Sequence, residues 1–192
     1  MDRLSQALNE AHRQTAGRSN WAGGASDGAL DGAITRSAAG MEGDLLHAID
    51  RGEIELMFQP QFAFSDDRLY GAEVLARWRH PVLGRVGAGT LFAVAERVDF
   101  VSQLSQHISE RALAAAARWP AELHPLRLSL NLTAADLADS GFMERTRAAI
   151  CRSGFPPARL TLEVTEQALV SDLVRSAEAL RALGEDGVQI AI

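Results

Sequence analysis

The chain has 192 residues, of which 47% are hydrophobic and 23% are charged, so it can form one domain with a sizeable core. Its formal net charge of −6 gives no basic field that would attract nucleic acid or an anionic membrane surface, and neither is expected as a partner. The single cysteine, Cys151, excludes a disulfide framework. The cysteine content also favours a cytoplasmic location, and Cys151 is expected to be a small core residue. No stretch approaches the roughly 20 apolar residues of a membrane span.

The sequence predicts two regions of different character. Residues 1–40 are rich in Gly, Ala, Ser and Asp and offer little apolar surface to bury, which is typical of a flexible arm or linker. Helical and strand patterns become regular from Met41 onward. We therefore expect the folded domain to occupy residues 41–192.

The predicted domain begins with a helix in 42–52 that ends at Gly52, followed by two strands in 53–64 and 69–78 around the turn "DDR". The later helices are expected in 91–98, 101–119, a segment capped by Thr133, 142–152 (ended by Gly154) and 171–184 (capped by Ser171, ended by Gly184). The later strands are expected in 126–132, 159–166 and 188–192. This alternation predicts an α/β fold with parallel strands and helical crossovers, either an open doubly wound sheet or a β/α barrel.

Three of the predicted strands alternate between polar and apolar residues. The members of the more polar face are Glu73, Leu75 and Arg77 in "AEVLARW", Arg127, Ser129 and Asn131 in "LRLSLNL", and Thr161, Glu163 and Thr165 in "LTLEVTE". In a barrel this face points inward, and the polar groups near the carboxyl ends of the strands converge at the barrel mouth.

Two carboxylates and an amide on this face, Glu73, Glu163 and Asn131, form an oxygen-only set that suits Mg²⁺ or Mn²⁺ rather than Zn²⁺. A sheet face open to water explains the same alternation, with Glu73 paired to Arg77 or Arg79. The pattern by itself therefore leaves a metal site and a solvated surface as alternatives.

The stretches "FQPQF…LYGAEVLARWRHPVLG…FAVAE", "LSLNLTAADL" and "LTLEVTEQAL" occur in this order from about Asp44 to Ile192. Together they resemble the EAL domain family of bacterial cyclic di-GMP phosphodiesterases. The resemblance implies a modified TIM barrel whose first strand is antiparallel to the rest, and of which this sequence would supply about the first five strands. It also implies that two Mg²⁺ or Mn²⁺ ions activate a water, which converts cyclic di-GMP to linear pGpG.

The resemblance also implies a role for individual residues. The implied metal ligands are Glu73, Asn131 and Glu163, the implied substrate contacts are Gln59, Leu75 and Arg77, and Glu166 is implied to steady a mobile loop near the metals. The family motif reads Glu73-Val74-Leu75 here, with valine in place of alanine, and Val74 is expected to face away from the site.

The family continues after the last matching strand with DDFGTG, whose two aspartates bind metal, and with a lysine on a later strand that orients or activates the water. The 192 residues contain neither, and all 19 basic residues are arginines. We therefore expect a truncated domain that binds metal weakly and is inactive or nearly so by itself. Two alternatives remain: a degenerate module that regulates by binding cyclic di-GMP or a protein partner, and a truncated gene product without function. The resemblance leaves the oligomeric state open, with a homodimer as one alternative.

Overall fold

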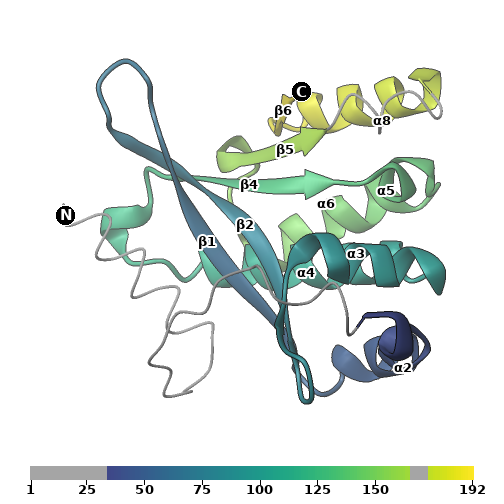
Figure 1. Cartoon of the computed structure of the whole chain (residues 1–192). Helices are drawn as coiled ribbons and strands as arrows, with labels where there is room; N and C mark the ends of the chain where they lie inside the picture. Colours follow the sequence, from purple (N-terminus) through teal and green to yellow (C-terminus); the bar gives the residue numbers. More distant parts are fainter. Residues whose placement is uncertain (1–33, 165–172) are drawn as a thin grey trace.

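The computed structural model of the chain describes residues 34–164 and 173–192. Its centre is one mixed sheet with the strand order β1-β2-β4-β5-β6, and β3 pairs with β2 outside this path. The strand bounds are β1 Ile54–Phe62, β2 Leu69–His80, β3 Gly84–Val86, β4 Arg127–Leu132, β5 Leu160–Val164 and β6 Gln189–Ala191. Strand β1 is antiparallel to β2, whereas β2, β4, β5 and β6 are parallel, and these described strands do not close into a complete barrel (Figure 1).

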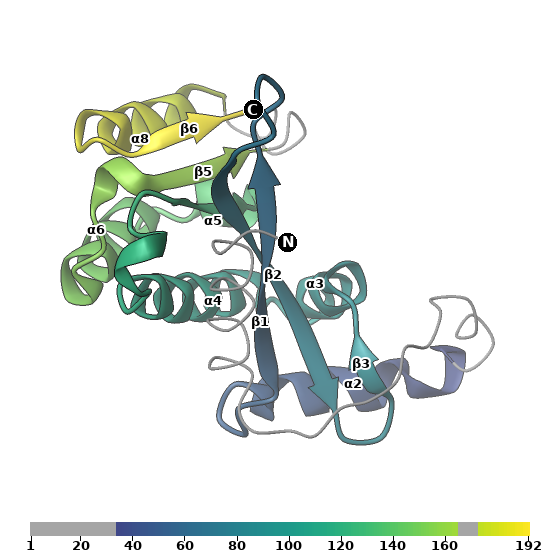
Figure 2. The same ribbon diagram turned by 90° about the vertical axis from the view of Figure 1, so that its left-hand side faces the viewer.

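Helices connect the parallel strands. Their bounds are α2 Ile34–Ala48, α3 Ala88–Arg97, α4 Val101–Ala116, α5 Ala134–Ala138, α6 Phe142–Ser153 and α8 Leu173–Glu185, with 3-10 turns η1 Ala121–Leu123 and η2 Pro157–Arg159. Figure 2 shows α4 and α6 packed together on one side of the strands, and this is the side that carries the apolar core. Among the described residues, no helix combines the length and the hydropathy that crossing a bilayer requires.

The two faces of the sheet differ as the alternating pattern predicts. On the helix-covered face Trp78, Leu128 and Leu160 are fully buried, and each burial of this kind stabilises the fold by roughly 1.5–3 kcal/mol. On the opposite face, which we call the inner face, Glu73 and Glu163 are only partly exposed and have polar neighbours. The apolar face of the sheet therefore packs in the core, and the polar face is available for a site.

Two of the predicted helix ends are confirmed, whereas α2 ends at Ala48 rather than at Gly52. Thr133 forms a capping box with Asp136 at the start of α5, and Gly154 ends α6 in a left-handed conformation with φ 70°. The predicted end of α8 at Gly184 is wrong, because the helix continues to Glu185 and the left-handed residue is Gly187, with φ 94°.

Three further differences from the sequence prediction have simple causes. Cys151 is exposed rather than in the core, because it follows the buried Ile150 and so lies about 100° further around α6. The last strand, expected over 188–192, covers only Gln189–Ala191, and Ile192 lies at its open end. The short strand β3 was not predicted; it extends the hairpin beside the end of β2.

Helix α2 begins at Ile34, upstream of the helix start expected from the sequence, and lies across the end of the β1–β2 hairpin that is remote from the turn at 63–68 (Figure 2). The carboxylate of Asp44 lies 3.3 Å from Nε2 of His80 at the end of β2. The indole nitrogen of Trp78 donates a hydrogen bond to Glu53, just after α2. The contact between Asp44 and His80 attaches α2 to the sheet. Of the arm predicted for residues 1–40, residues 34–40 are helical, whereas residues 1–33 and the predicted cap at Ser171 lie outside the described residues.

Candidate functional site

The structure brings the three predicted metal ligands together on the inner face. Asn131 of β4 and Glu163 of β5 lie directly opposite each other in parallel register. The side-chain amide of Asn131 donates a hydrogen bond of 2.7 Å to Oε1 of Glu73 on β2. Three residues spread over 90 positions of sequence thus become neighbours because β2, β4 and β5 are adjacent strands.

The chemistry of these three side chains fits a hard divalent cation. Because the NH₂ group of Asn131 faces Glu73, its amide oxygen is the atom left for a ligand bond, and each carboxylate keeps further lone pairs. Within the described ranges 34–164 and 173–192, no group of three or more His, Cys, Asp and Glu side chains is placed to hold a metal. Two carboxylates and one amide remain, a set that suits Mg²⁺ because this ion commonly takes one or two carboxylates together with waters and substrate phosphates.

The residues with implied substrate contacts border this set. Gln59 of β1 lies directly opposite Glu73 in the antiparallel pair and is exposed. Leu75 shares the inner face with Glu73 and is partly buried, whereas Val74 is buried on the helix-covered face, as expected. The predicted loop-steadying residue, Glu166, lies outside the described residues.

Arg77 lies on the inner face and is partly buried. Its guanidinium donates a 2.8 Å hydrogen bond to the carbonyl oxygen of Ala76. Glu55 lies directly opposite Arg77, but its carboxylate pairs with Arg79 at 3.5 Å and with Arg85 at 3.8 Å. In the part of the chain that the structure describes, Arg77 forms no salt bridge, so its positive charge is available to an anionic ligand.

Gln61 is a member of the site that the sequence analysis did not identify. Its Nε2 donates a 3.0 Å hydrogen bond to Oε1 of Glu163, and its Oε1 accepts a 3.0 Å hydrogen bond from Oγ of Ser129. The sequence could have indicated Gln61, because residues two positions apart on a strand share a face and Gln61 therefore lies on the same face as Gln59. Sequence alone does not give the distance to Glu163, which is 102 residues away.

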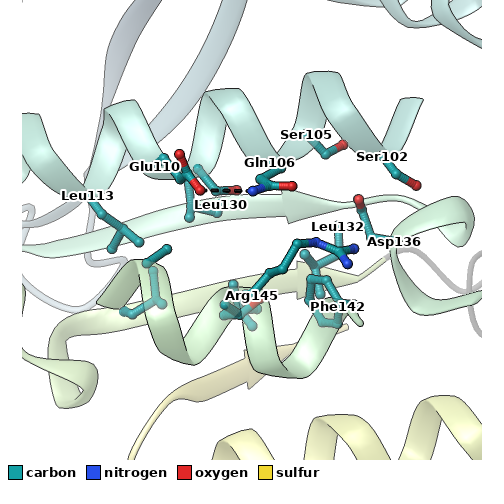
Figure 3. A pocket seen from close by; sticks show the side chains of 15 residues that line it. Ser102, Ser105, Gln106, Glu110, Leu113, Leu130, Leu132, Asp136, Phe142 and Arg145 are labelled. Carbon is teal, nitrogen blue, oxygen red and sulfur yellow. Dashed lines mark hydrogen bonds between the residues drawn. The ribbon is translucent and has the colours of Figure 1, made fainter. Parts of the chain in front are cut away.

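A separate cavity of about 40 Å³ lies on the other side of the sheet, between α4, α6 and the apolar face of β4 and β5 (Figure 3). Its lining includes Ser105, Leu130, Asp136, Arg145 and Leu162. This volume holds a few water molecules at most, whereas small-molecule sites usually have about 300 Å³ or more. The cavity therefore does not qualify as a nucleotide site.

The carboxyl group beside this cavity has a structural task. Burial raises the pKa of Asp136, while hydrogen bonds from the backbone N–H and the hydroxyl of Thr133 oppose that shift. Since these bonds complete the capping box of α5, Asp136 stabilises a helix start. Its perturbed pKa needs no catalytic explanation.

Sequence comparison shows which known proteins the chain is similar to. The family profile described as "EAL domain" matches residues 42–192. Cyclic di-GMP phosphodiesterase PA2567 of Pseudomonas aeruginosa is 34% identical over 137 residues, which are 71% of this chain and 23% of that protein. Cyclic di-GMP phosphodiesterase NbdA of the same organism is 31% identical over 153 residues, 79% of this chain and 20% of that protein. The chain thus spans about a fifth of the length of these curated relatives.

Structure comparison gives the same result for the fold. The solved structure titled "PaMucR Phosphodiesterase, c-di-GMP complex" superposes with a TM-score of 0.74 and 30% sequence identity, covering 78% of this chain and 61% of that one. The likeness confirms the predicted α/β fold related to the TIM barrel, with an antiparallel first strand and an incomplete set of strands. The open doubly wound sheet that the pattern also allowed is thereby set aside.

Proposed function

Because the chain belongs to the EAL domain family, we propose that its inner sheet face binds cyclic di-GMP and a divalent cation for hydrolysis of the dinucleotide to linear pGpG. The observation that carries this proposal is the contact between Asn131 and Glu73, with Glu163 on the next strand and Arg77 on the same face. The relatives named as cyclic di-GMP phosphodiesterases support the same substrate.

Each residue has a distinct task in this proposal. Glu73, Asn131 and Glu163 would hold Mg²⁺ or Mn²⁺ through oxygen atoms. The ion, when bound, supplies an acidified water and neutralises charge on the phosphodiester. Arg77 orients the substrate by donating its N–H groups to a phosphate oxygen, which a guanidinium can do with two parallel bonds. Gln59 and Leu75 border the same face and contact the remainder of the nucleotide.

We also propose that the 192 residues by themselves bind the ions weakly and turn over substrate slowly or not at all. Three ligand side chains are few for the two ions that the family resemblance implies, and the chain has no lysine to orient the attacking water. The cytoplasmic location is part of the proposal; it is supported by the single cysteine of the sequence.

The test combines a binding and a turnover measurement on the purified chain. Calorimetry with cyclic di-GMP, in Ca²⁺ to suppress turnover, should detect binding that Arg77→Ala weakens by about 10–100-fold, the expected loss for a charge-assisted contact. The matched control is Arg152→Ala, because Arg152 pairs with Glu110 on the helix layer and should leave binding unchanged.

Chromatography of pGpG after incubation with Mn²⁺ separates the remaining outcomes. Binding with little conversion supports the proposed binding site and the proposed slow turnover, and it also agrees with a cyclic di-GMP-binding regulator. Rapid conversion contradicts the proposed slow turnover but supports cyclic di-GMP as the substrate. No detectable binding, or binding that is equally strong in Arg77→Ala, contradicts the proposed site.

A further inference from the structure

We propose that Gln61 is a positioning residue that holds Glu163 for metal binding, and that Gly71 is required because its missing side chain gives Gln61 the room to reach across β2. This inference rests on the proposed function of the inner face. It adds a residue of β1 to a site whose proposed ligands come from β2, β4 and β5.

The hydrogen bonds of Gln61 define a strut across the sheet. Gln61 lies on β1, at one edge of the strand order, and its side chain contacts Ser129 on β4 and Glu163 on β5. Both bonds measure 3.0 Å and are partly buried, so water competes with them less than at the surface. The strut therefore passes the intervening strand β2.

Gly71 explains how this path remains open. Gly71 is the residue of β2 directly opposite Gln61. A Cβ atom at Gly71 would lie 3.1 Å from Oε1 of Gln61 and 3.1 Å from the carbonyl oxygen of Arg127. Contacts this short are tighter than ordinary van der Waals packing, and the carbonyl belongs to the backbone of β4, so the side chain of Gln61 would have to give way.

The directions of the two hydrogen bonds fix the orientation of the Gln61 side-chain amide. The hydroxyl of Ser129 donates to the amide oxygen of Gln61, which turns the NH₂ group of Gln61 towards Glu163. A carboxylate accepts that bond through Oε1 and keeps Oε2 for a cation. Outer-shell partners of this kind fix the orientation of a ligand before the metal arrives.

Glu163 has little other side-chain support. Its neighbour on β6 is Ala191, which has no polar group, and Asn131 on the other side donates to Glu73. Within the described residues, Gln61 is the one side chain with a hydrogen bond to the carboxylate of Glu163. Each proposed acidic ligand thus has one amide partner: Asn131 for Glu73 and Gln61 for Glu163.

The first test measures Mn²⁺ affinity of the full chain by electron paramagnetic resonance of free Mn²⁺. Gln61→Leu keeps the size of the side chain and removes both hydrogen bonds, and it should weaken Mn²⁺ binding by about tenfold or more. Gln106→Leu is the matched control, because Gln106 donates a similar 2.9 Å bond to Glu110 on the helix layer. An affinity that is equal in the wild type and in both variants would overturn the positioning role.

A pair of glycine substitutions tests whether Gly71 is needed to give the Gln61 side chain room. Gly71→Ala should weaken Mn²⁺ binding in the same direction as Gln61→Leu, whereas Gly89→Ala should not, because nothing lies within 4 Å of a Cβ at Gly89. Circular dichroism melting without metal verifies that each variant is folded. If Gly71→Ala leaves the affinity of a folded protein unchanged, the proposed role of Gly71 is wrong.

A metal-free measurement keeps this inference separable from the proposed function. In side-chain amide NMR spectra the NH₂ group of Gln61 should exchange with water several-fold more slowly than that of the exposed Gln59, and Glu163→Ala should remove the difference. If the wild type binds no Mn²⁺ while this protection is present, the metal-binding proposal fails and the strut stands. If Gln61 and Gln59 exchange equally fast, the strut does not exist in solution.

Discussion

The side-chain amide of Asn131 lies 2.7 Å from a carboxylate oxygen of Glu73, although 58 residues separate them in sequence. The bond joins two parallel strands on the face that the helices leave uncovered. Asn131 also lies directly opposite Glu163 in the parallel register, so one amide and two carboxylates stand on three neighbouring strands. This relationship gives the proposed site its first testable consequence.

Substitution of Glu73 by Gln should weaken Mn²⁺ binding by at least about tenfold, because it removes a negative charge and a ligand oxygen. Asn131→Ala should have a similar effect, since it removes one ligand and the amide that orients the other. Electron paramagnetic resonance of free Mn²⁺ measures the affinity of both variants. Glu122→Gln on the exposed 3-10 turn η1 is the control for loss of one charge; an equal effect there would mean that the ion responds only to net charge.

The free charge of Arg77 predicts a graded response to substitution. Arg77→Lys keeps the charge but loses the paired N–H groups, so its affinity for cyclic di-GMP should lie between those of the wild type and Arg77→Ala. Raising the salt concentration should weaken wild-type binding more than Arg77→Ala binding, because salt screens the attraction between Arg77 and a phosphate, which the variant lacks. Calorimetry at two salt concentrations measures this, and equal salt dependence in both proteins would argue against a phosphate contact.

Two helix-end glycines should respond in opposite ways to alanine. Gly154→Ala should lower the free energy of unfolding by about 1–2 kcal/mol, because Gly154 has a left-handed conformation with φ 70°. Gly184→Ala should raise it by up to about 1 kcal/mol, because Gly184 lies inside α8 with open space around it. Urea unfolding compares the pair; destabilisation of similar size in both would contradict the assigned helix end.

The buried carboxyl group of Asp136 predicts a pH dependence of stability. Burial raises its pKa in the folded state above the usual value near 4, so the folded state binds the proton more tightly than the unfolded state. Its stabilising contribution is therefore full below about pH 4 and is lost as pH rises through the raised pKa. The free energy of unfolding of the wild type, relative to Asp136→Asn, should fall between pH 4 and pH 7 in urea titrations. A difference that is the same at both pH values would refute this assignment.

Much of the fold follows from local patterns in the sequence. The leucines of β4 alternate with polar residues at period two, and this alone identifies the face that packs under helices. Thr133 and Gly154 act through their own backbone neighbours, so their roles at helix ends were predictable. The failures at Cys151 and Gly184 have the same origin, because the exact rotation and the last turn of a helix depend on what packs against it.

The sequence by itself determined which residue types were available for chemistry: its motifs singled out Glu73, Asn131, Glu163 and Arg77, and strand parity placed them on one face. Tertiary structure decided which of these side chains meet and what supports them. Contacts such as Gln61 with Glu163 depend on strand order and register between distant segments, and on the absence of a side chain at Gly71. Local propensity carries no information about such contacts, because they form only after the sheet has brought the segments together.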